Sequence, residues 1–536
     1  MASDAAATTG TGGATGGAAD GVQKGILGWI ERTGNKLPDP AFIFLYLIGA
    51  LVVVSILANL MGLSALHPTK TNEDGSALVI AAASLLSAEN IRKLWVDMPK
   101  TFTHFHPLGY VLVVMLGAGI AERSGLFAAA MRGAVRNAPT ALLTPMVALT
   151  AMVGNLAADA AYVVLIPLAG VLYAAAGRHP IAGIAASFAG VSGGFSANLF
   201  PGQLDALLFG ITEQAGEALL PAYDAVIVGN WYFIAGMTVF YLPVIWFVTD
   251  RIIEPRLGGF TPQTASHASA AEADAPLTDD QKKGLGRAGL AMLAVVALWT
   301  FMTIGPGTPL LDQSQSDLAL KMTPLFRSMV AMFFILFLAA GWAYGAAAGT
   351  VKGHRDIVRM MSEAMGDLAY YLVLAFFAAH FVALFNWSNL GLIFAVHGAG
   401  AIEAAGLPMP VTLGFIVLLT GLVNLFVGSA SAKWALLAPV LIPMLMLLGV
   451  SPEATTAAYR VGDSATNIIT PLMVYFPLIL TFCQRWKPEF GLGSLTATMV
   501  PYSIWLLLSG LFLIVVWVAL GVPMGPGAPV GFELPR

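Results

Sequence analysis

The chain has 536 residues, of which 57% are hydrophobic and only 10% are charged. A soluble domain carries about 25% charged residues, so this composition excludes an ordinary soluble protein and indicates an integral membrane protein. The net charge of −4 is spread over short loops without a basic stripe, which argues against nucleic acid as a partner. The single cysteine, Cys483, excludes an intrachain disulfide.

The chain begins with residues 1–25, a segment rich in Ala, Gly and Thr that lacks the basic and apolar regions of a signal peptide. We predict that this segment is a disordered cytoplasmic tail. The first hydrophobic span is expected near 42–62, and Lys24, Arg32 and Lys36 precede it. Because basic residues favour the cytoplasmic side, the N-terminus is expected in the cytoplasm.

Apolar segments of bilayer length then recur along the chain, which predicts an all-α polytopic fold. They lie at 107–121, 141–155, 160–177, 226–249, 289–304, 325–348, 411–427, 433–449 and 498–522. Segments 181–212, 368–402 and 455–480 are also apolar but are broken by Gly or Pro, so they are awkward as simple spans. We therefore divide the chain into a first half (26–250), a cytoplasmic connector (251–289), a second half (290–524) and a C-terminal tail (525–536).

The two halves share a pattern that predicts an inverted repeat, as found in many secondary transporters. Asn155 and Asn198 in the first half are 43 residues apart, and so are Asn424 and Asn467 in the second. We expect the segments around Asn198 and Asn467 to meet inside the bilayer and to form the substrate site.

In the second half, several polar residues occur in one apolar stretch. A charge at mid-bilayer costs about 2.5 to 3.5 kcal/mol, so such a residue needs a partner or a cavity. Arg460 and Asp463 are three residues apart and could form an ion pair on one helix face, followed by Asn467. A helix break near Gly462 or Pro471 would free backbone groups to bind ions.

In the first half, the glycine-rich segment 190–198 predicts the tip of a re-entrant hairpin near 181–212, with Asn198 at the tip. Asp205 supplies an acidic group, although a solvated loop carboxylate is an equal alternative. Four other polar residues are interpreted as interfacial or packing residues outside the site: Glu122, Arg123, His380 and His397. Asp159 is either a helix-start residue near the interface, which we favour, or a proton carrier.

The sequence motifs give little support for an enzyme. Segment 190–194 matches G-x-S-x-G, but a nucleophile elbow requires a soluble α/β sheet, for which this chain has no room. A rhomboid-like serine protease would need far fewer residues. The sequence contains no H-E-x-x-H motif and no Walker loop, so we expect a transporter that is not an enzyme and that draws on an ion gradient. A channel is the alternative class.

Three blocks carry a family resemblance: the decapeptide at 31–40 (ERTGNKLPDP), the block at 429–434 and the block at 459–464 (YRVGDS). Together they resemble the p-aminobenzoyl-glutamate transporter (AbgT) family over nearly the whole chain. The resemblance implies a homodimer in the bacterial inner membrane, with about nine transmembrane helices and two re-entrant hairpins per protomer. It also implies uptake of p-aminobenzoyl-glutamate, or efflux of sulfonamide antimetabolites.

The resemblance further implies the site residues. The substrate site would comprise Asp205, Ser431, Trp434, Arg460, Asp463 and Pro471, and a sodium-like site would comprise Asn424, Asp463 and Asn467. Trp434 can stack on an aryl ring, and Arg460 can form a bidentate pair with a carboxylate. No cofactor is expected beyond H⁺ or Na⁺ as coupling ion, with Asp205 or Asp463 as proton carrier. A sodium-coupled carboxylate carrier of similar architecture is the alternative.

Overall fold

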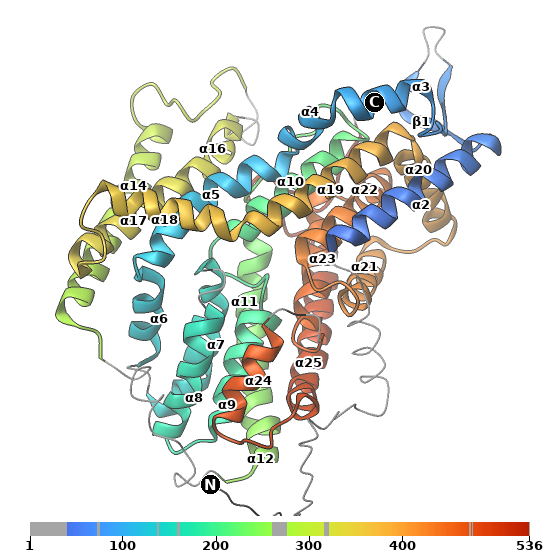
Figure 1. Ribbon diagram of the computed structural model, residues 1–536. Coiled ribbons are helices and arrows are strands. Elements are labelled where there is room, and N and C mark those ends of the chain that lie inside the picture. The colour runs from blue at the N-terminus through green and yellow to red at the C-terminus, as the bar shows by residue number, and fades with distance from the viewer. Residues whose placement is uncertain are drawn as a thin grey trace, which may run out of the picture.

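The computed structural model describes residues 40–71, 76–136, 139–157, 161–259, 276–315, 321–470, 473 and 475–534 (Figure 1). The predicted tail at 1–25, residues 260–275 of the connector at 251–289, and the residues Asp159 and Pro471 lie outside this part of the chain. The described part is helical apart from one short antiparallel pair of strands, β1 (Ser64–Thr71) and β2 (Ala77–Ala81).

Seven helices of the described residues are long and apolar enough to cross a membrane. They are α2 (Pro40–Leu60), α11 (Trp231–Phe247) with its continuation into α12 (Glu254–Leu257), α14 (Asp279–Ile304), α17 (Met329–Ala348), α19 (Ala369–Trp387), α22 (Ala430–Leu447) and α25 (Leu492–Ala519). An eighth span results if α5 (His106–Arg123) and α6 (Leu126–Arg136), bent by 63°, are counted as one. The all-α polytopic class is confirmed, whereas nine spans and the inverted repeat stay predictions.

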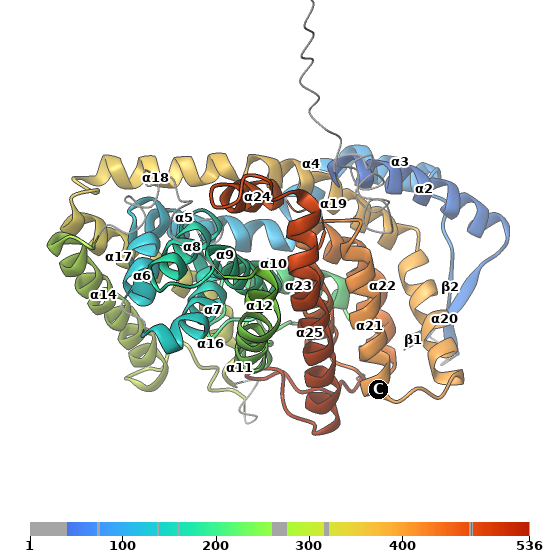
Figure 2. The same ribbon diagram turned by 90° about the horizontal axis from the view of Figure 1, so that it is seen from below.

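Three of the expected spans are shorter helices in the structure: α7 (Leu143–Gly154), α8 (Ile166–Ala175) and α21 (Met409–Asn424). In lipid every backbone polar group has to be satisfied within the protein, so short helices are tolerated only where protein surrounds them. In agreement, α7 and α8 lie in the middle of the molecule (Figure 2) and contribute largely buried residues to its main core.

The helices are arranged in a wide central body with a flank at each end (Figures 1 and 2). One flank contains α14 and α17, which pack on each other, and α17 also packs on α5. The other flank contains α2, α20 (Leu390–Ala404) and the β1–β2 pair. Between the flanks lie α7 to α11 of the first half and α21 to α25 of the second half, so the central body is where the two halves meet.

The three broken segments are interrupted in different ways. Segment 181–212 contains α9 (Pro180–Phe188), the π-helical turn η4 (Ala189–Gly193), an irregular stretch at 194–202 and α10 (Gln203–Glu217). Segment 368–402 contains α19 and α20, separated at Asn389, which has a left-handed φ of 60°. Segment 455–480 contains α23 (Pro452–Thr466) and α24 (Phe476–Gln484).

Of the two expected positions of a helix break, Gly462 is wrong, because α23 continues through this residue and ends at Thr466. The other position, Pro471, lies outside the described residues between α23 and α24. Gly462 is instead required for the packing of two helices. A Cβ atom at this position would overlap Thr420 and the carbonyl oxygen of Val417 on α21. The glycine therefore allows α21 and α23 to pack in close backbone contact.

Candidate functional site

The irregular stretch of the first half contacts α23 of the second half. The backbone N–H of Ser196, at the tip of the first half, donates to Oγ of Ser464 on α23 at 3.0 Å. Every residue of α23 is buried, so its polar side chains are held against protein from all directions. The two segments that were expected to meet are thus in direct contact.

An ion pair joins the halves beside this contact. Nη1 of Arg460 donates to Oδ1 of Asp205 at 2.7 Å, and the two side chains are only 2% and 6% exposed. Oδ2 of Asp205 also accepts from the backbone N–H of Gly202 at 2.8 Å, in the first turn of α10. The alternative of a solvated loop carboxylate is therefore wrong, because α10 directs Asp205 into the protein toward α23.

The expected ion pair between Arg460 and Asp463 is also wrong. Asp463 pairs with the ammonium group of Lys433, near the start of α22. Spacing along one helix shows which residues share a face, but the partners here approach from other helices. Lys433 was absent from the predicted site, although a lysine entering an apolar span is a signal that could have identified it.

The three residues of the expected sodium-like site do lie together. Nδ2 of Asn424 donates to the carbonyl oxygen of Asp463 at 2.6 Å and to Oδ1 of Asn467 at 2.9 Å. Oδ1 of Asn424 accepts from the ammonium of Lys433. The ammonium of Lys433 therefore lies among these oxygens, and the sodium-like site stays a prediction.

The first half contains an uncharged counterpart of this cluster. Nδ2 of Asn155 donates to the carbonyl oxygen of Gly194 at 3.3 Å, and the two residues are separated by 39 positions. Asn424 and Asp463 are separated by the same 39 positions. The two halves thus share a hydrogen bond at corresponding positions, but only the second half has a carboxylate and an ammonium there.

A cavity of about 240 Å³ lies on the first-half side of the Asp205–Arg460 pair. Both members of the pair line it, together with Asn155, Asn198 and Tyr371. The remaining walls are largely apolar: Val111, Met115, Leu156, Tyr162, Phe195, Phe200, Leu204, Leu207 and Leu368, with Ser196, Gly202 and Gln203. Ligand pockets usually begin at about 300 Å³, so this cavity is sized for a small ligand with a polar end.

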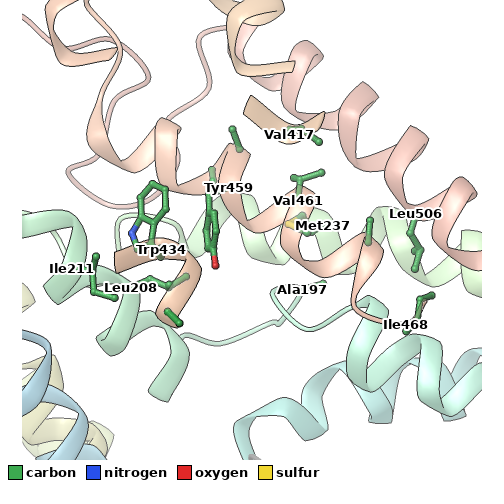
Figure 3. Packing of buried hydrophobic residues seen from close by; sticks show 14 of the residues in the cluster. Ala197, Leu208, Ile211, Met237, Val417, Trp434, Tyr459, Val461, Ile468 and Leu506 are labelled. Carbon is green, nitrogen blue, oxygen red and sulfur yellow. The ribbon is translucent and has the colours of Figure 1, made fainter. Parts of the chain in front are cut away.

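Three other expected substrate residues do not line this cavity: Ser431, Trp434 and Asp463. Trp434 is fully buried: its ring lies beside that of Tyr459, with centroids 4.5 Å apart, and its indole N–H donates to Oγ1 of Thr212 at 2.9 Å (Figure 3). Ser431 borders a separate small void. Asn467 does not line the cavity, whereas Asn198 does, and Pro471 lies outside the described residues.

The two histidines that were left out of the site have local partners. A ring nitrogen of His380 lies 2.6 Å from the carbonyl oxygen of Phe376, and one of His397 lies 3.1 Å from that of Ser64. Neither residue borders the cavity. Asn230 was missed by the sequence analysis, and its Oδ1 lies 3.4 Å from Nη1 of Arg460.

A multispanning helical body, short buried helices that meet at its centre, and a buried ion pair beside a cavity define a membrane transporter. Comparison with known proteins gives the family. The chain belongs to the AbgT putative transporter family, whose model matches residues 25–532. It is 36% identical over 503 residues to the p-aminobenzoyl-glutamate transport protein of Escherichia coli (strain K12), covering 94% of this chain and 96% of the relative.

Two solved structures share the fold over nearly the whole chain. The Alcanivorax borkumensis YdaH transporter, described as having an unusual topology, matches with a TM-score of 0.84 and 41% identity, covering 91% of this chain and all of that one. Neisseria gonorrhoeae MtrF, described as one of a class of antimetabolite efflux pumps, matches with a TM-score of 0.87 and 41% identity, covering 94% of this chain and all of that one.

Proposed function

We propose that this protein is an ion-gradient-driven secondary transporter of p-aminobenzoyl-glutamate and related aryl amides, including sulfonamide antimetabolites, and that it performs no covalent chemistry on them. The relatives support the substrate class, since one is named for p-aminobenzoyl-glutamate transport and another for antimetabolite efflux. The single observation that carries the proposal is the buried Asp205–Arg460 pair in the wall of the cavity.

Arg460 is suited to recognise a substrate carboxylate. A guanidinium has five N–H donors and pairs with a carboxylate through two parallel hydrogen bonds. Only Nη1 of Arg460 is used by Asp205, and Nε has no hydrogen-bond partner among the described residues. The apolar walls around the cavity suit the aryl ring.

Asp205 gives the site a means of coupling transport to protons. While its carboxylate is ionised, Asp205 neutralises Arg460 and competes with the substrate for it. Protonation of Asp205 removes that competition, so Arg460 becomes available to the substrate carboxylate. We propose that Asp205 is the proton carrier, and that Trp434 holds α22 in position against α10 and α23 through its contacts with Thr212 and Tyr459.

The oligomer and its orientation are part of the same proposal. We propose a homodimer with a cytoplasmic N-terminus in the bacterial inner membrane. The relatives, which are bacterial transporters, support the membrane location. Light scattering of the purified protein in detergent measures the mass. A homodimer has twice the 56.0 kDa of the chain after the detergent contribution is subtracted.

The experiment is transport of labelled p-aminobenzoyl-glutamate in proteoliposomes, with a pH gradient and a sodium gradient imposed separately. We expect the pH gradient to drive transport in the parent protein and to fail with Asp205→Asn. Transport driven by sodium alone supports the alternative, a sodium-coupled carboxylate carrier. If neither gradient moves p-aminobenzoyl-glutamate or a labelled sulfonamide, the proposed substrate class is wrong.

A further inference from the structure

Glu453 is a buried acidic residue that the proposed transport steps do not use. It is the second residue of α23, it is 9% exposed, and within the described part of the chain it makes no ion pair. Its Oε1 accepts from Oη of Tyr223 at 2.8 Å, and the backbone N–H of Val226 also donates to its carboxyl group. Because an unpaired charge is costly inside a protein, this carboxyl group is suited to bind a proton.

A small void of about 20 Å³ separates Glu453 from the pair of Asp205 and Arg460. A polar cavity of this size holds one water molecule, which usually makes about three hydrogen bonds. The polar residues that line the void are numerous enough for these bonds: Asp205, Thr212, Asn230, Glu453, Thr456 and Arg460. Arg460 in this lining is 2% exposed, and its Nε has no hydrogen-bond partner among the described residues.

The ion pair stands between this void and the proposed substrate cavity, because Asp205 and Arg460 line both spaces. Asn230 fixes the distance between the pair and Glu453. Its Oδ1 lies 3.4 Å from Nη1 of Arg460, and its Nδ2 donates to the backbone carbonyl oxygen of Glu453 at 2.8 Å. A proton can therefore reach Asp205 from the side of Glu453 while a substrate occupies the cavity on the other side.

Polar contacts continue from Glu453 toward one face of the molecule. Tyr223 lies close enough to Asp224 to be affected by its charge, and Asp224 pairs with Arg327 of α16 (Thr323–Arg327) at 2.6 Å. In Figure 1, α16 lies at the opposite end of the molecule from α12, which precedes the connector. Under the proposed orientation, the contacts lead to the periplasmic side.

Several elements place titratable or charged groups around Glu453 and Tyr223. The C-terminal segment contacts Tyr223 through the uncharged ring of Phe532. The titratable or charged groups are Asp205 and Glu213 of α10, Arg460 of α23, Asp224 of the loop after α10, Tyr110 of α5, which donates to Glu213, and Arg327 of α16.

We propose that Glu453 is a second proton-binding residue, which passes protons between the periplasmic side and Asp205 through one water molecule in the small void. The O–H bond of the Glu453 carboxyl group breaks, and an O–H bond forms on the Asp205 carboxylate, with the water accepting one proton and donating another. The Glu453 carboxylate then takes up a proton from the periplasmic side. This inference rests on the proposed function, because it supplies the proton for Asp205.

The first test compares two modes of transport of labelled p-aminobenzoyl-glutamate in proteoliposomes. One mode is driven by a pH gradient, and the other is exchange with unlabelled compound at equal pH, which needs no net proton movement. Glu453→Gln can still accept from Tyr223 but cannot carry the proton. We expect it to lose at least about tenfold in driven transport, since a positioned proton-transfer group usually contributes more than this, and to retain exchange. Glu403→Gln, at an exposed position of α20, is the matched control and should retain both modes.

The second test uses no substrate. Infrared difference spectra of purified protein between acidic and alkaline pH detect protonated carboxyl groups by their C=O stretching bands. The parent protein and Glu403→Gln are expected to show a titrating band that Glu453→Gln lacks. Tyr223→Phe should shift the pH midpoint of this band upward, because the Glu453 carboxylate loses a hydrogen bond that favours its charged form. This variant keeps the test informative even if Glu453→Gln does not fold.

Two results overturn the proposal. One is an equal effect of Glu453→Gln on driven transport and on exchange, including no effect on either, because Glu453 would then only hold the loop around Tyr223 in position. The other is an infrared titration that neither Glu453→Gln nor Tyr223→Phe changes. If the parent protein transports no p-aminobenzoyl-glutamate, the proposed substrate is wrong, and the infrared titration still decides whether Glu453 binds a proton.

Discussion

The ion pair between Asp205 and Arg460 permits a quantitative prediction. Removing one partner of a buried pair costs about 3 to 5 kcal/mol, because the other charge is left without compensation. Arg460→Met leaves Asp205 with the Gly202 N–H and the positive N-terminal end of α10. The free energy of unfolding should therefore fall by an amount near the lower end of this range. Asp205→Asn retains an oxygen that can accept from Gly202, so it removes the charge and preserves the cap of α10.

The double variant Arg460→Met, Asp205→Asn removes both charges. Its loss of unfolding free energy should therefore be smaller than the sum of the losses of the two single variants by about 2 kcal/mol. The assay is chemical unfolding of purified protein in detergent, followed by tryptophan fluorescence for the parent, both single variants and the double variant. If the single losses simply add, the pair contributes no coupling and the geometry assigned to Arg460 is refuted.

Three further predictions concern packing and pH. Gly462→Ala should lower the unfolding midpoint strongly because its Cβ would overlap α21, whereas Gly400→Ala, with no atom within 4 Å, should be neutral or stabilising. Trp434→Phe should lower the free energy of unfolding by about 1 to 2 kcal/mol, because a hydrogen bond and side-chain volume are lost, whereas Trp434→Ala should lower it by about 3 to 5 kcal/mol. Chemical unfolding in detergent measures both values. Burial, with a contribution from a nearby lysine, lowers the pKa of His179, whose Nδ1 accepts the first N–H bond of α9. Stability should therefore fall as the pH drops through about 6.5, where the unfolded imidazole protonates, and a thermal scan against pH should show a smaller fall for His179→Asn.

Much of the architecture follows from the sequence because membrane burial depends on segment length and polarity. The long apolar segments are helices, and the stretch around Asn198 is irregular because glycines give it no helical preference. The 43-residue asparagine spacing corresponds to a hydrogen bond between Asn424 and Asn467 in the second half, whereas Asn198 in the first half donates to the carbonyl oxygen of Met152. These features are local or periodic, so one sequence is sufficient to recognise them.

The partners of the buried charges could not be predicted in the same way. Arg460 and Asp463 share a helix, yet each is paired by a residue from another element, Asp205 from α10 and Lys433 from α22. Such pairings depend on how helices pack in three dimensions, which the spacing along one helix does not encode. Trp434 illustrates the same limit, because its aromatic chemistry suits a ligand while its packing buries it against Tyr459.

The most direct test of the central claim is to fill the cavity beside Asp205 and Arg460 and to measure transport of labelled p-aminobenzoyl-glutamate in proteoliposomes. Leu368→Trp places a large ring in this cavity, and Leu293→Trp, on the exposed face of α14, is the matched control. With both variants folded to the same unfolding midpoint, Leu368→Trp should lose at least about tenfold in transport, equivalent to about 1.4 kcal/mol, while Leu293→Trp should retain the parent rate. Parent-like transport by Leu368→Trp would contradict the assignment of this cavity as the substrate site.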